Sequence, residues 1–418
     1  MTTEMLLADE VSAIPLGDLD VSEPALFQRD VIDAYFARLR KEDPVHYCPD
    51  SAYGPYWSVT KYKDIMHVET SHQIYSSEAG LGGVVIDSEI IQGAEGDLEL
   101  PMFIAMDPPK HDDQRKAVSP IVAPGNLALL EGTIRERAGR ILDSLPVGEE
   151  FNWVDRVSIE LTTQMLATLF DFPFEERRKL TRWSDVTTAV PGFGIIDSLE
   201  QRKQELLECA ACFRGLWDQR TKQEPKADLI SMMAHSPATQ NMSPNEFLGN
   251  IMLLIVGGND TTRNSISGGV VALNQNPDQY EKLLANPALV TSMVPEIIRW
   301  QTPLTHMRRT ALDDADLGGK KIKKGDKVVM WYLSGNRDEE AIDRPNEFII
   351  DRERPRQHLS FGFGIHRCVG NRLAEMQLRV LWEEILKRFQ KVEIVGEPQR
   401  VHSNFIRGFT SLPVRLHA

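Results

Sequence analysis

The segment Phe361–Gly370, with the sequence FGFGIHRCVG, places a cysteine in a glycine-rich loop directly before an amphipathic helical pattern. Gly362 and Gly364 permit backbone conformations that a Cβ atom would forbid, so the chain can turn sharply around the cysteine. Arg367 precedes Cys368, and the free amide groups of the following helix face the same position. Both features favour a thiolate over a thiol. The segment therefore predicts an ionised cysteine that is held rigidly.

A rigid thiolate beneath a flat ligand is what a haem iron needs for cleavage of an O–O bond. The segment matches Phe-x-x-Gly-x-His/Arg-x-Cys-x-Gly, the haem-binding loop of the cytochrome P-450 family, and the chain therefore resembles a haem-thiolate monooxygenase. The resemblance implies a single-domain fold, mainly α with a minor β region. Haem b, an iron protoporphyrin IX, would lie between a long oxygen-activating helix and the helix after the cysteine loop. Cys368 would be the axial iron ligand, with Phe361, Gly362 and His366 as further haem contacts.

Glu296 and Arg299 form a Glu-x-x-Arg pair upstream of the cysteine, and Arg352 lies between that pair and the cysteine. On a helix, residues i and i+3 share one face, so the first two side chains can pair. A solvated surface pair is the ordinary interpretation of such a spacing. Together the three residues resemble the buried Glu-x-x-Arg…Arg network of the family, which implies a structural and not a catalytic role.

The apolar run Ile251–Val256 continues into the segment Gly257–Thr262, with the sequence GGNDTT. Ser243, followed by proline and then by glutamate at the third helical position, predicts the start of a long helix. Two glycines and two threonines at its centre are poor helix formers and indicate a break or a close helix crossing. The resemblance instead implies the oxygen-activating helix, in which Asp260 and Thr261 are the catalytic acid–alcohol pair that delivers protons.

His111 and Arg115 are one helical turn apart and therefore lie on the same side of a predicted helix. The resemblance implies that this pair binds the haem propionates, and an arginine fork suits a carboxylate. His366 and Arg309 complete the set that the resemblance implies. Arg308 is adjacent to Arg309 and is the alternative for the same position.

Hydrophobic periodicity and turn signals indicate a mainly helical chain with few strands. The predicted helices are at about 31–42, 111–122, 126–144, 154–170, 174–188, 199–221, 243–274, 276–284, 288–300 and 370–389. The predicted strands are 56–60, 327–331 and 391–394. Gly318-Gly319 and Lys324-Gly325 indicate hairpin turns.

The motifs draw on residues from 111 to 368, and nothing between Asp30 and the C-terminus has the composition of a linker. We therefore expect an N-terminal extension at 1–30 and one haem-thiolate monooxygenase domain at 31–418. Four cysteines in 418 residues do not indicate a disulfide scaffold. Cys209 and Cys212 lie in a helical pattern, which indicates helix packing rather than a zinc site.

The net charge of −14 argues against a nucleic acid partner. The segment Met1–Asp20 is acidic and lacks the basic and apolar regions of a signal peptide. Apolar runs elsewhere are far shorter than a membrane span. We therefore expect a cytoplasmic monomer without a transmembrane anchor, like the soluble bacterial class of the family.

Two segments have the character of mobile pocket walls. Residues 81–106 form a long loop punctuated by glycine, and residues 191–196 separate two helical patterns as a lid joint would. The resemblance implies a set of pocket residues that carries no charge, so an apolar substrate would be held by burial. These residues are Leu253, Val256, Gly257, Leu304, Thr305, Met307 and Phe409.

Residues 253–264 and 302–309 look like the bacterial alkane terminal-hydroxylase subfamily. This resemblance implies an alkane 1-monooxygenase that acts on medium-chain n-alkanes, and on related fatty acids or alicyclic compounds, at the terminal carbon. A terminal C–H bond is stronger than a methylene C–H bond, so the pocket must narrow until only a chain end reaches the iron. The predicted constriction consists of Leu253, Val256, Leu304 and Phe409.

The chain contains no flavin or nicotinamide segment, so electrons from NAD(P)H must arrive through external partners. A ferredoxin with its ferredoxin reductase fits the soluble bacterial class, and O2 and a small apolar substrate are the other reactants. Arg115, Arg367 and Arg372 would give a basic face for an acidic donor. The alternatives are another apolar substrate such as a terpene, a peroxide-driven peroxygenase, and a non-catalytic haem sensor. The Asp260–Thr261 pair argues against the peroxygenase, which does not require it.

Overall fold

Helices account for most of residues 9–87 and 99–418, which this computed structural model describes. The longer helices are α3 (Ile32–Glu42), α4 (Tyr62–Thr70), α6 (Lys110–Val118), α7 (Pro124–Asp143), α8 (Glu160–Phe170), α9 (Arg178–Thr188), α10 (Leu199–Arg220), α12 (Pro244–Gln275), α13 (Pro277–Ala285), α14 (Val290–Gln301) and α16 (Asn371–Arg388). Short helices are α2 (Pro24–Gln28), α11 (Leu229–His235) and α15 (Tyr332–Gly335).

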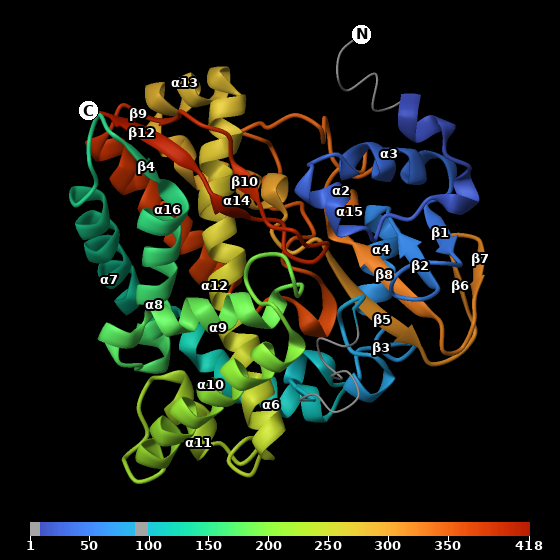
Figure 1. The fold of residues 1–418 in the computed structure, drawn as a ribbon, viewed down its shortest axis with the longest axis horizontal. Coiled ribbons are helices and arrows are strands. Elements are labelled where there is room, and N and C mark those ends of the chain that lie inside the picture. Colours follow the sequence, from blue (N-terminus) through green and yellow to red (C-terminus); the bar gives the residue numbers. More distant parts are fainter. Residues whose placement is uncertain (1–8, 88–98) are drawn as a thin grey trace.

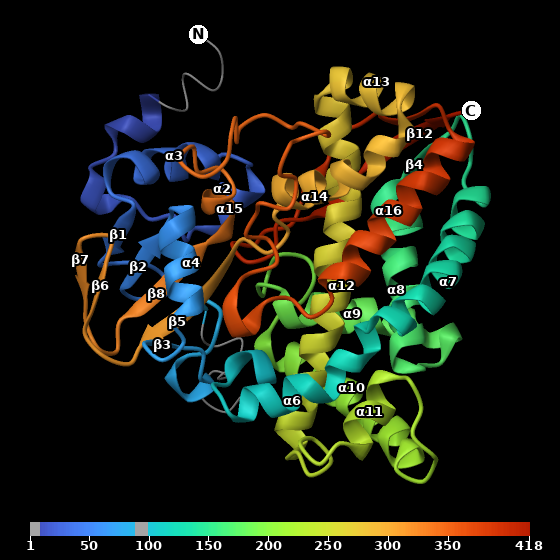
Figure 2. The same cartoon turned by 180° about the vertical axis from the view of Figure 1, so that it is seen from behind.

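The strands are short and come from both ends of the chain. They are β1 (Val45–Cys48), β2 (Tyr56–Val59), β3 (Tyr75–Ser76), β4 (Glu150–Asn152), β5 (His306–Ala311), β6 (Ala315–Leu317), β7 (Lys320–Ile322), β8 (Lys327–Trp331), β9 (Lys391–Ile394), β10 (Gln399–Arg400), β11 (Phe409–Ser411) and β12 (Pro413–His417). Long helices fill one side of the molecule, and the sheet of β1, β2, β8, β5 and β3 fills the other side (Figure 1). The view from behind shows the same division (Figure 2).

The mainly helical fold that the sequence predicted is confirmed. Each predicted helical range contains a helix, and the predicted strands at 56–60, 327–331 and 391–394 correspond to β2, β8 and β9. The Gly318-Gly319 turn joins β6 to β7 as an antiparallel hairpin. Sequence patterns did not predict α4 or β5. Two adjacent arginines interrupt the alternation in β5, and both are buried because both find acceptors inside the protein.

Helix α12 crosses the middle of the helical side (Figure 1). Its start follows the predicted signals, because the Ser243 side chain accepts a hydrogen bond from the backbone N–H of Glu246 and proline occupies the first turn. The glycines at its centre do not break the helix. A Cβ atom at Gly258 would lie 2.8 Å from Leu166 of α8, so this glycine permits a close helix crossing.

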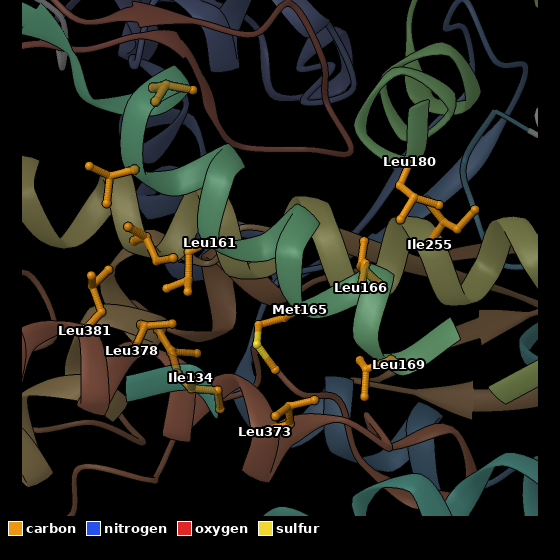
Figure 3. Close-up of a cluster of buried hydrophobic side chains, with 14 of the residues drawn as sticks. Ile134, Leu161, Met165, Leu166, Leu169, Leu180, Ile255, Leu373, Leu378 and Leu381 are labelled. Atoms are coloured by element: carbon orange, nitrogen blue, oxygen red, sulfur yellow. The ribbon is translucent and has the colours of Figure 1, made fainter. Parts of the chain in front are cut away.

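The apolar core of the helical side surrounds α8. Leu161, Met165 and Leu166 of this helix lie between α12 and α16, where Leu378 and Leu381 contribute to the same cluster (Figure 3). These side chains are almost completely buried. Because such burial contributes about 1.5–3 kcal/mol for each large aliphatic side chain, this cluster stabilises the packing of α8 against α12 and α16.

The N-terminal segment packs onto the sheet side. Phe27 and Phe36 contact the buried ring of Trp331, with ring centroids 5.8 and 5.4 Å from it. The proposed boundary at residue 30 stays a prediction. Among the described residues, no single helix has both the length and the apolarity of a membrane span; the bent pair at 110–122 and 124–143 meets those two criteria only when both helices are taken together.

A buried carboxylate connects α14 to the loops that lead toward the cysteine. Both oxygens of Glu296 accept hydrogen bonds from Arg299, at 2.7 and 2.8 Å, and from Arg352, at 3.0 and 3.1 Å. Arg299 also donates to the backbone carbonyls of Asn336 and Pro345. Burial raises the pKa of Glu296, but Arg299 and Arg352 together lower it by more, so the net pKa lies below its ordinary value. The predicted three residues are therefore joined in one network, in which Glu296 and Arg299 are fully buried and the Arg352 side chain is 7% exposed.

Replacing Glu296 by alanine would leave two buried arginines without their shared carboxylate. We expect Glu296→Ala to lower the free energy of unfolding by about 3–5 kcal/mol, measured by urea denaturation followed by circular dichroism. Glu340→Ala is the matched control, because Glu340 pairs with Lys61 at the surface and its side chain is 63% exposed. Equal losses in the two variants would contradict the assignment of a bracing role to Glu296.

Candidate active site

An internal cavity lies between α12, α16 and the loop before α16, with about 2040 Å³ of empty space, part of it open to solvent. Phe361, Gly362, His366 and Cys368 of the cysteine loop form part of its wall. Apolar residues from α6, α8, α12 and the segments on either side of residues 88–98 form much of the remainder. The cavity therefore joins the cysteine loop to the centre of α12.

The backbone holds the cysteine loop in one conformation. The N–H of Cys368 donates to the carbonyl of Phe361 at 2.8 Å. Gly364 has φ +64°, and a Cβ atom there would lie 2.3 Å from the carbonyl oxygen of Glu69 in α4. Only glycine fits this close approach. The loop is thus pressed against α4 and opens its cysteine to the cavity.

Histidine and arginine side chains from three separate segments meet at the cavity wall. His111 and Arg115 come from α6, Arg309 from β5 and His366 from the cysteine loop. The two imidazole rings are in edge contact, with centroids 4.3 Å apart. Burial, with Arg309 as the next cause, lowers the pKa of His366 to about 2, so this imidazole is neutral and the arginines carry the positive charge.

The structure distinguishes the two adjacent arginines, because only one of them reaches the cavity. Arg309 lines the cavity, whereas Arg308 donates to the backbone carbonyls of Gly82 at 2.8 Å and Leu81 at 3.0 Å. Successive side chains of a strand point to opposite faces, so only one of the two can face the cysteine loop. Arg308 instead holds the beginning of the 81–106 segment.

Thr261 and Asp260 lie at different depths. Thr261 lines the cavity, and its Oγ1 donates to the carbonyl of Gly257 at 2.9 Å. Asp260 is fully buried behind it, where Oδ1 accepts from Arg263 at 2.8 Å and from Asn259 at 3.1 Å. Arg263 also contacts Asp185 of α9 at 2.5 Å. Burial raises the pKa of Asp260 to about 6, against the lowering effect of Arg263.

Most of the residues predicted for the pocket line this cavity, namely Leu253, Val256, Gly257, Leu304 and Met307. Thr305 and Phe409 do not, and for them the prediction needs correction. The Thr305 side chain is buried, and its hydroxyl donates to the carbonyl of Asn404. Phe409 is buried in β11 beneath the guanidinium of Arg400, 4.8 Å from its ring centre. Phe405 is the aromatic residue of the C-terminal segment that lines the cavity.

Of the two segments predicted to form mobile pocket walls, residues 81–106 contribute to the cavity wall and residues 191–196 do not. Val84, Val85, Met102 and Phe103 line the cavity, so the described parts of 81–106 contribute to its wall, and residues 88–98 lie outside the described residues. In the predicted lid joint, Phe193 stacks on His402 with ring centroids 3.8 Å apart. Sequence reasoning did not identify Phe103 or Phe405, because an isolated apolar residue in a loop has no distinguishing pattern.

Residues 194–415 match the protein family described as Cytochrome P-450, which covers more than half of the chain. Linalool 8-monooxygenase from Pseudomonas putida is 37% identical over 402 residues, which include 95% of this chain and 98% of the relative.

The chain belongs to the cytochrome P-450 family.

Two solved cytochrome P-450 structures resemble it along almost the whole length. Cytochrome P-450-153 from Novosphingobium aromaticivorans is 47% identical with a TM-score of 0.89, and covers 96% of this chain and 100% of its own. CYP153D17 from Sphingomonas sp. PAMC 26605 is 48% identical with a TM-score of 0.90, and covers 97% and 100%. As a cytochrome P-450, the chain is a haem-dependent monooxygenase that receives NAD(P)H electrons through redox partners.

The residues around the cavity of this cytochrome P-450 fit haem. Among the described residues, neither ring nitrogen of His366 has a hydrogen-bond partner, and Nε2 of His111 has none. A buried polar atom without a partner costs about 1–3 kcal/mol, so these nitrogens favour a ligand that offers hydrogen-bonding oxygens. Haem propionates offer such oxygens, and Arg115 and Arg309 at the same wall supply the matching charge.

The cysteine also fits an iron ligand. Burial raises the pKa of the Cys368 thiol, and the lowering effects of the Gly370 amide, Arg115 and Arg367 do not offset it. Arg367 and the helix amides therefore act in the predicted direction and favour the thiolate, while burial opposes them. A bound metal cation deprotonates a coordinating thiol outright, so haem iron would favour the thiolate further.

The raised pKa of Asp260 makes the stability of the protein depend on pH. Between pH 3.8, the ordinary value, and about 6, the native state holds a proton on Asp260 that the unfolded chain has lost. The contribution of Asp260 to the free energy of unfolding is therefore full below this window and falls as pH rises through it, by roughly 3 kcal/mol in total.

We expect the difference in unfolding free energy between wild type and Asp260→Asn to decrease from about pH 4 to pH 6 and to be constant above, measured by urea denaturation across that range. Thr261→Val, which changes a neighbouring group that does not ionise, should keep the wild-type pH dependence. Parallel pH curves for wild type and Asp260→Asn would show that Asp260 does not titrate in this window.

Proposed function

We propose that this cytochrome P-450 hydroxylates the terminal carbon of medium-chain n-alkanes, with fatty acids and alicyclic compounds as related substrates. The observation that carries the proposal is the chemistry of the cavity wall. Among the described lining residues, the charged side chains are Arg115 and Arg309, and both belong to the proposed haem contacts. The wall around α12, β5 and residues 81–106 is overwhelmingly apolar. An unbranched hydrocarbon has no polar group that would need a partner in such a wall.

The sequence supports this substrate class. The Pseudomonas putida relative acts on carbon 8 of linalool, a compound of the terpene alternative. The segments 253–264 and 302–309, which carry the resemblance to alkane terminal hydroxylases, supply Leu253, Val256 and Leu304 to the cavity wall. Because intrinsic reactivity favours methylene carbons, terminal attack requires this wall to position the chain end.

In the proposed site, Cys368 would bind the haem iron, and Phe361 and Gly362 would contact the haem beside it. The remaining haem contacts, which bind the propionates, are His111, Arg115, Arg309 and His366. Bound haem supplies the iron at which dioxygen is bound and reduced. The apolar wall excludes water and orients the substrate.

Proton delivery is assigned to α12. Thr261 holds a proton on Oγ1 at the cavity wall, with Asp260 adjacent to it on the buried side. A carboxyl group with a pKa of about 6 exchanges its proton readily near neutral pH. Arg263 pairs with both Asp260 and Asp185, and the Asp185 side chain is 25% exposed, so the charged network behind Asp260 extends to the α9 surface.

The electron donor in this proposal is a ferredoxin supplied by a ferredoxin reductase, with the enzyme a cytoplasmic monomer. Arg367 and Arg372 are exposed next to Cys368 and suit an acidic donor. Arg115 does not contribute to this surface, because it lines the cavity and donates to the backbone carbonyl of Arg367. An acid–alcohol pair at the cavity favours this reductive route over a peroxygenase, which needs no such pair.

Iron ligation by Cys368 has a spectroscopic signature that is independent of the substrate. We expect the reduced, carbon monoxide-treated protein to show the red-shifted Soret band of thiolate ligation, and Cys368→Ser to lose it. Cys212→Ser is the matched control, since Cys212 lies in α10, away from the cavity wall, and should retain the band. A wild-type spectrum without the red shift would refute the proposed haem site.

Terminal selectivity should depend on the volume of the apolar wall. With n-octane and a ferredoxin system, we expect 1-octanol as the main wild-type product. In Leu304→Ala and Val256→Ala we expect a severalfold rise in the ratio of 2-octanol to 1-octanol, because the widened wall lets a methylene carbon approach the iron. Product analysis by gas chromatography measures this ratio.

Leu129→Ala, a surface change at a side chain that is 76% exposed, should leave the product ratio unchanged. Titrations of the haem absorption band with n-alkanes of several lengths and with linalool distinguish the substrate classes. Saturation by linalool but by none of the alkanes would favour the terpene alternative. An unchanged ratio in every cavity variant would show that the wall does not determine regiochemistry.

A further inference from the structure

A second buried carboxylate lies beside the proposed haem contacts, and the function described above does not use it. Glu69, in the last turn of α4, is 2% exposed. Its Oε2 accepts a hydrogen bond from Nη2 of Arg309 at 2.9 Å, and its Oε1 accepts one from the hydroxyl of Tyr332 in α15. The three residues come from α4, β5 and α15, which lie together on the sheet side (Figure 2).

We propose that Glu69 and Tyr332 orient Arg309 toward a haem propionate, and that the buried charge of Glu69 holds down the reduction potential of the haem. This inference rests on the proposed function, because that function assigns Arg309 to a propionate. Glu69 is thus a positioning residue, which acts through Arg309 and through its electric field.

The network is in contact with the haem-binding loop. Arg309 and Tyr332 both line the cavity, whereas Glu69 lies behind them. A Cβ atom at Gly362 would lie 3.5 Å from both Oε1 of Glu69 and the hydroxyl of Tyr332. The carboxylate is therefore next to the haem site without being able to bind iron or substrate.

Arg309 has the geometry of a bridge between two carboxylates. A guanidinium carries five N–H donors in a rigid plane. One contact goes to Glu69 and another, from Nη1, goes to the carbonyl of Arg308 at 2.7 Å. These two contacts fix the plane of the guanidinium and leave donors available at the cavity wall, where a propionate requires them.

The contacts of Glu69 suit the ionised form of its carboxyl group. Both oxygens accept hydrogen bonds, and an ionised carboxylate is the form that only accepts. The pKa of Tyr332 is raised well above its ordinary value by burial and by Glu69, so its hydroxyl remains a donor. Burial raises the pKa of Glu69 above its ordinary value, and the lowering effects of Arg309 and Tyr332 offset only part of that rise.

A negative charge in a low-dielectric interior opposes the arrival of an electron nearby. Reduction of the haem adds one electron, and Glu69 makes that step less favourable. Removing the charge should therefore raise the reduction potential. A charge on the surface has little effect, because water and salt screen it.

The test is a spectroelectrochemical titration of the haem-loaded, substrate-free protein at pH 7.5. In Glu69→Gln, which keeps the shape of the side chain, we expect about a tenfold higher ferrous-to-ferric ratio at a given applied potential, a shift of about 59 mV for one electron. Glu340→Gln, at the exposed surface carboxylate, should not change the potential.

Tyr332→Phe keeps the ring and removes only the hydrogen bond that stabilises the charged carboxylate. We expect a smaller shift in the same direction, because Glu69 then spends more time protonated. The double variant Glu69→Gln/Tyr332→Phe should match Glu69→Gln alone, since Tyr332 acts through the Glu69 charge. If Glu69→Gln fails to fold, the shift in Tyr332→Phe still decides the matter.

An unchanged potential in Glu69→Gln, or additive shifts in the double variant, would overturn this inference. The carbon monoxide spectrum separates this failure from failure of the proposed function. Wild type without the red-shifted Soret band refutes the proposed haem site, whereas a normal band with an unchanged potential refutes only the role of Glu69.

Discussion

The carboxylate of Glu296 is the contact on which the geometry of the site depends. The cysteine loop has little regular structure of its own and takes its position from neighbouring segments. Arg299, held by Glu296, fixes the carbonyl of Asn336, and Asn336 then bonds the backbone N–H of Leu359 and the hydroxyl of Ser360. Those residues directly precede the loop. The buried network around Glu296 thus fixes the segment before the loop relative to α14, and with it the position of Cys368, the residue that is proposed to bind iron.

The cavity makes the protein less stable when it is empty than when a ligand fills it. The apolar cluster around α8 includes residues of α12 and α16, and the cavity lies beside it. The histidines at the wall leave nitrogen atoms without partners, which is unfavourable in an empty interior and favourable once an acceptor binds. The site is therefore preorganised for a ligand that brings carboxylates to the histidines and arginines of the wall.

Two buried acidic residues, Asp260 and Glu69, each lie beside an arginine behind the cavity wall, but their surroundings differ. Asp260 has one oxygen without a partner, and the second carboxylate, Asp185, adds to its raised pKa, which suits a group that exchanges protons. Glu69 has donors on both oxygens, which suits a fixed charge. Both carboxylates are buried, so the difference between a proton-exchanging Asp260 and a charged Glu69 comes from their hydrogen-bond partners.

The sequence by itself determined the local features: the cysteine loop, the start of α12, the Glu-x-x-Arg spacing and most helix positions, because each depends on residues within a few turns of one another. The tertiary structure decided which arginine faces the cavity, that Phe405 and not Phe409 lines it, and that Glu69 meets Arg309 and Tyr332. It also added the burial of Cys368, which opposes the predicted effect of Arg367 and the helix amides on the thiol. The physical reason is that burial and hydrogen-bond partners come from segments far apart in the chain, and no local pattern records them.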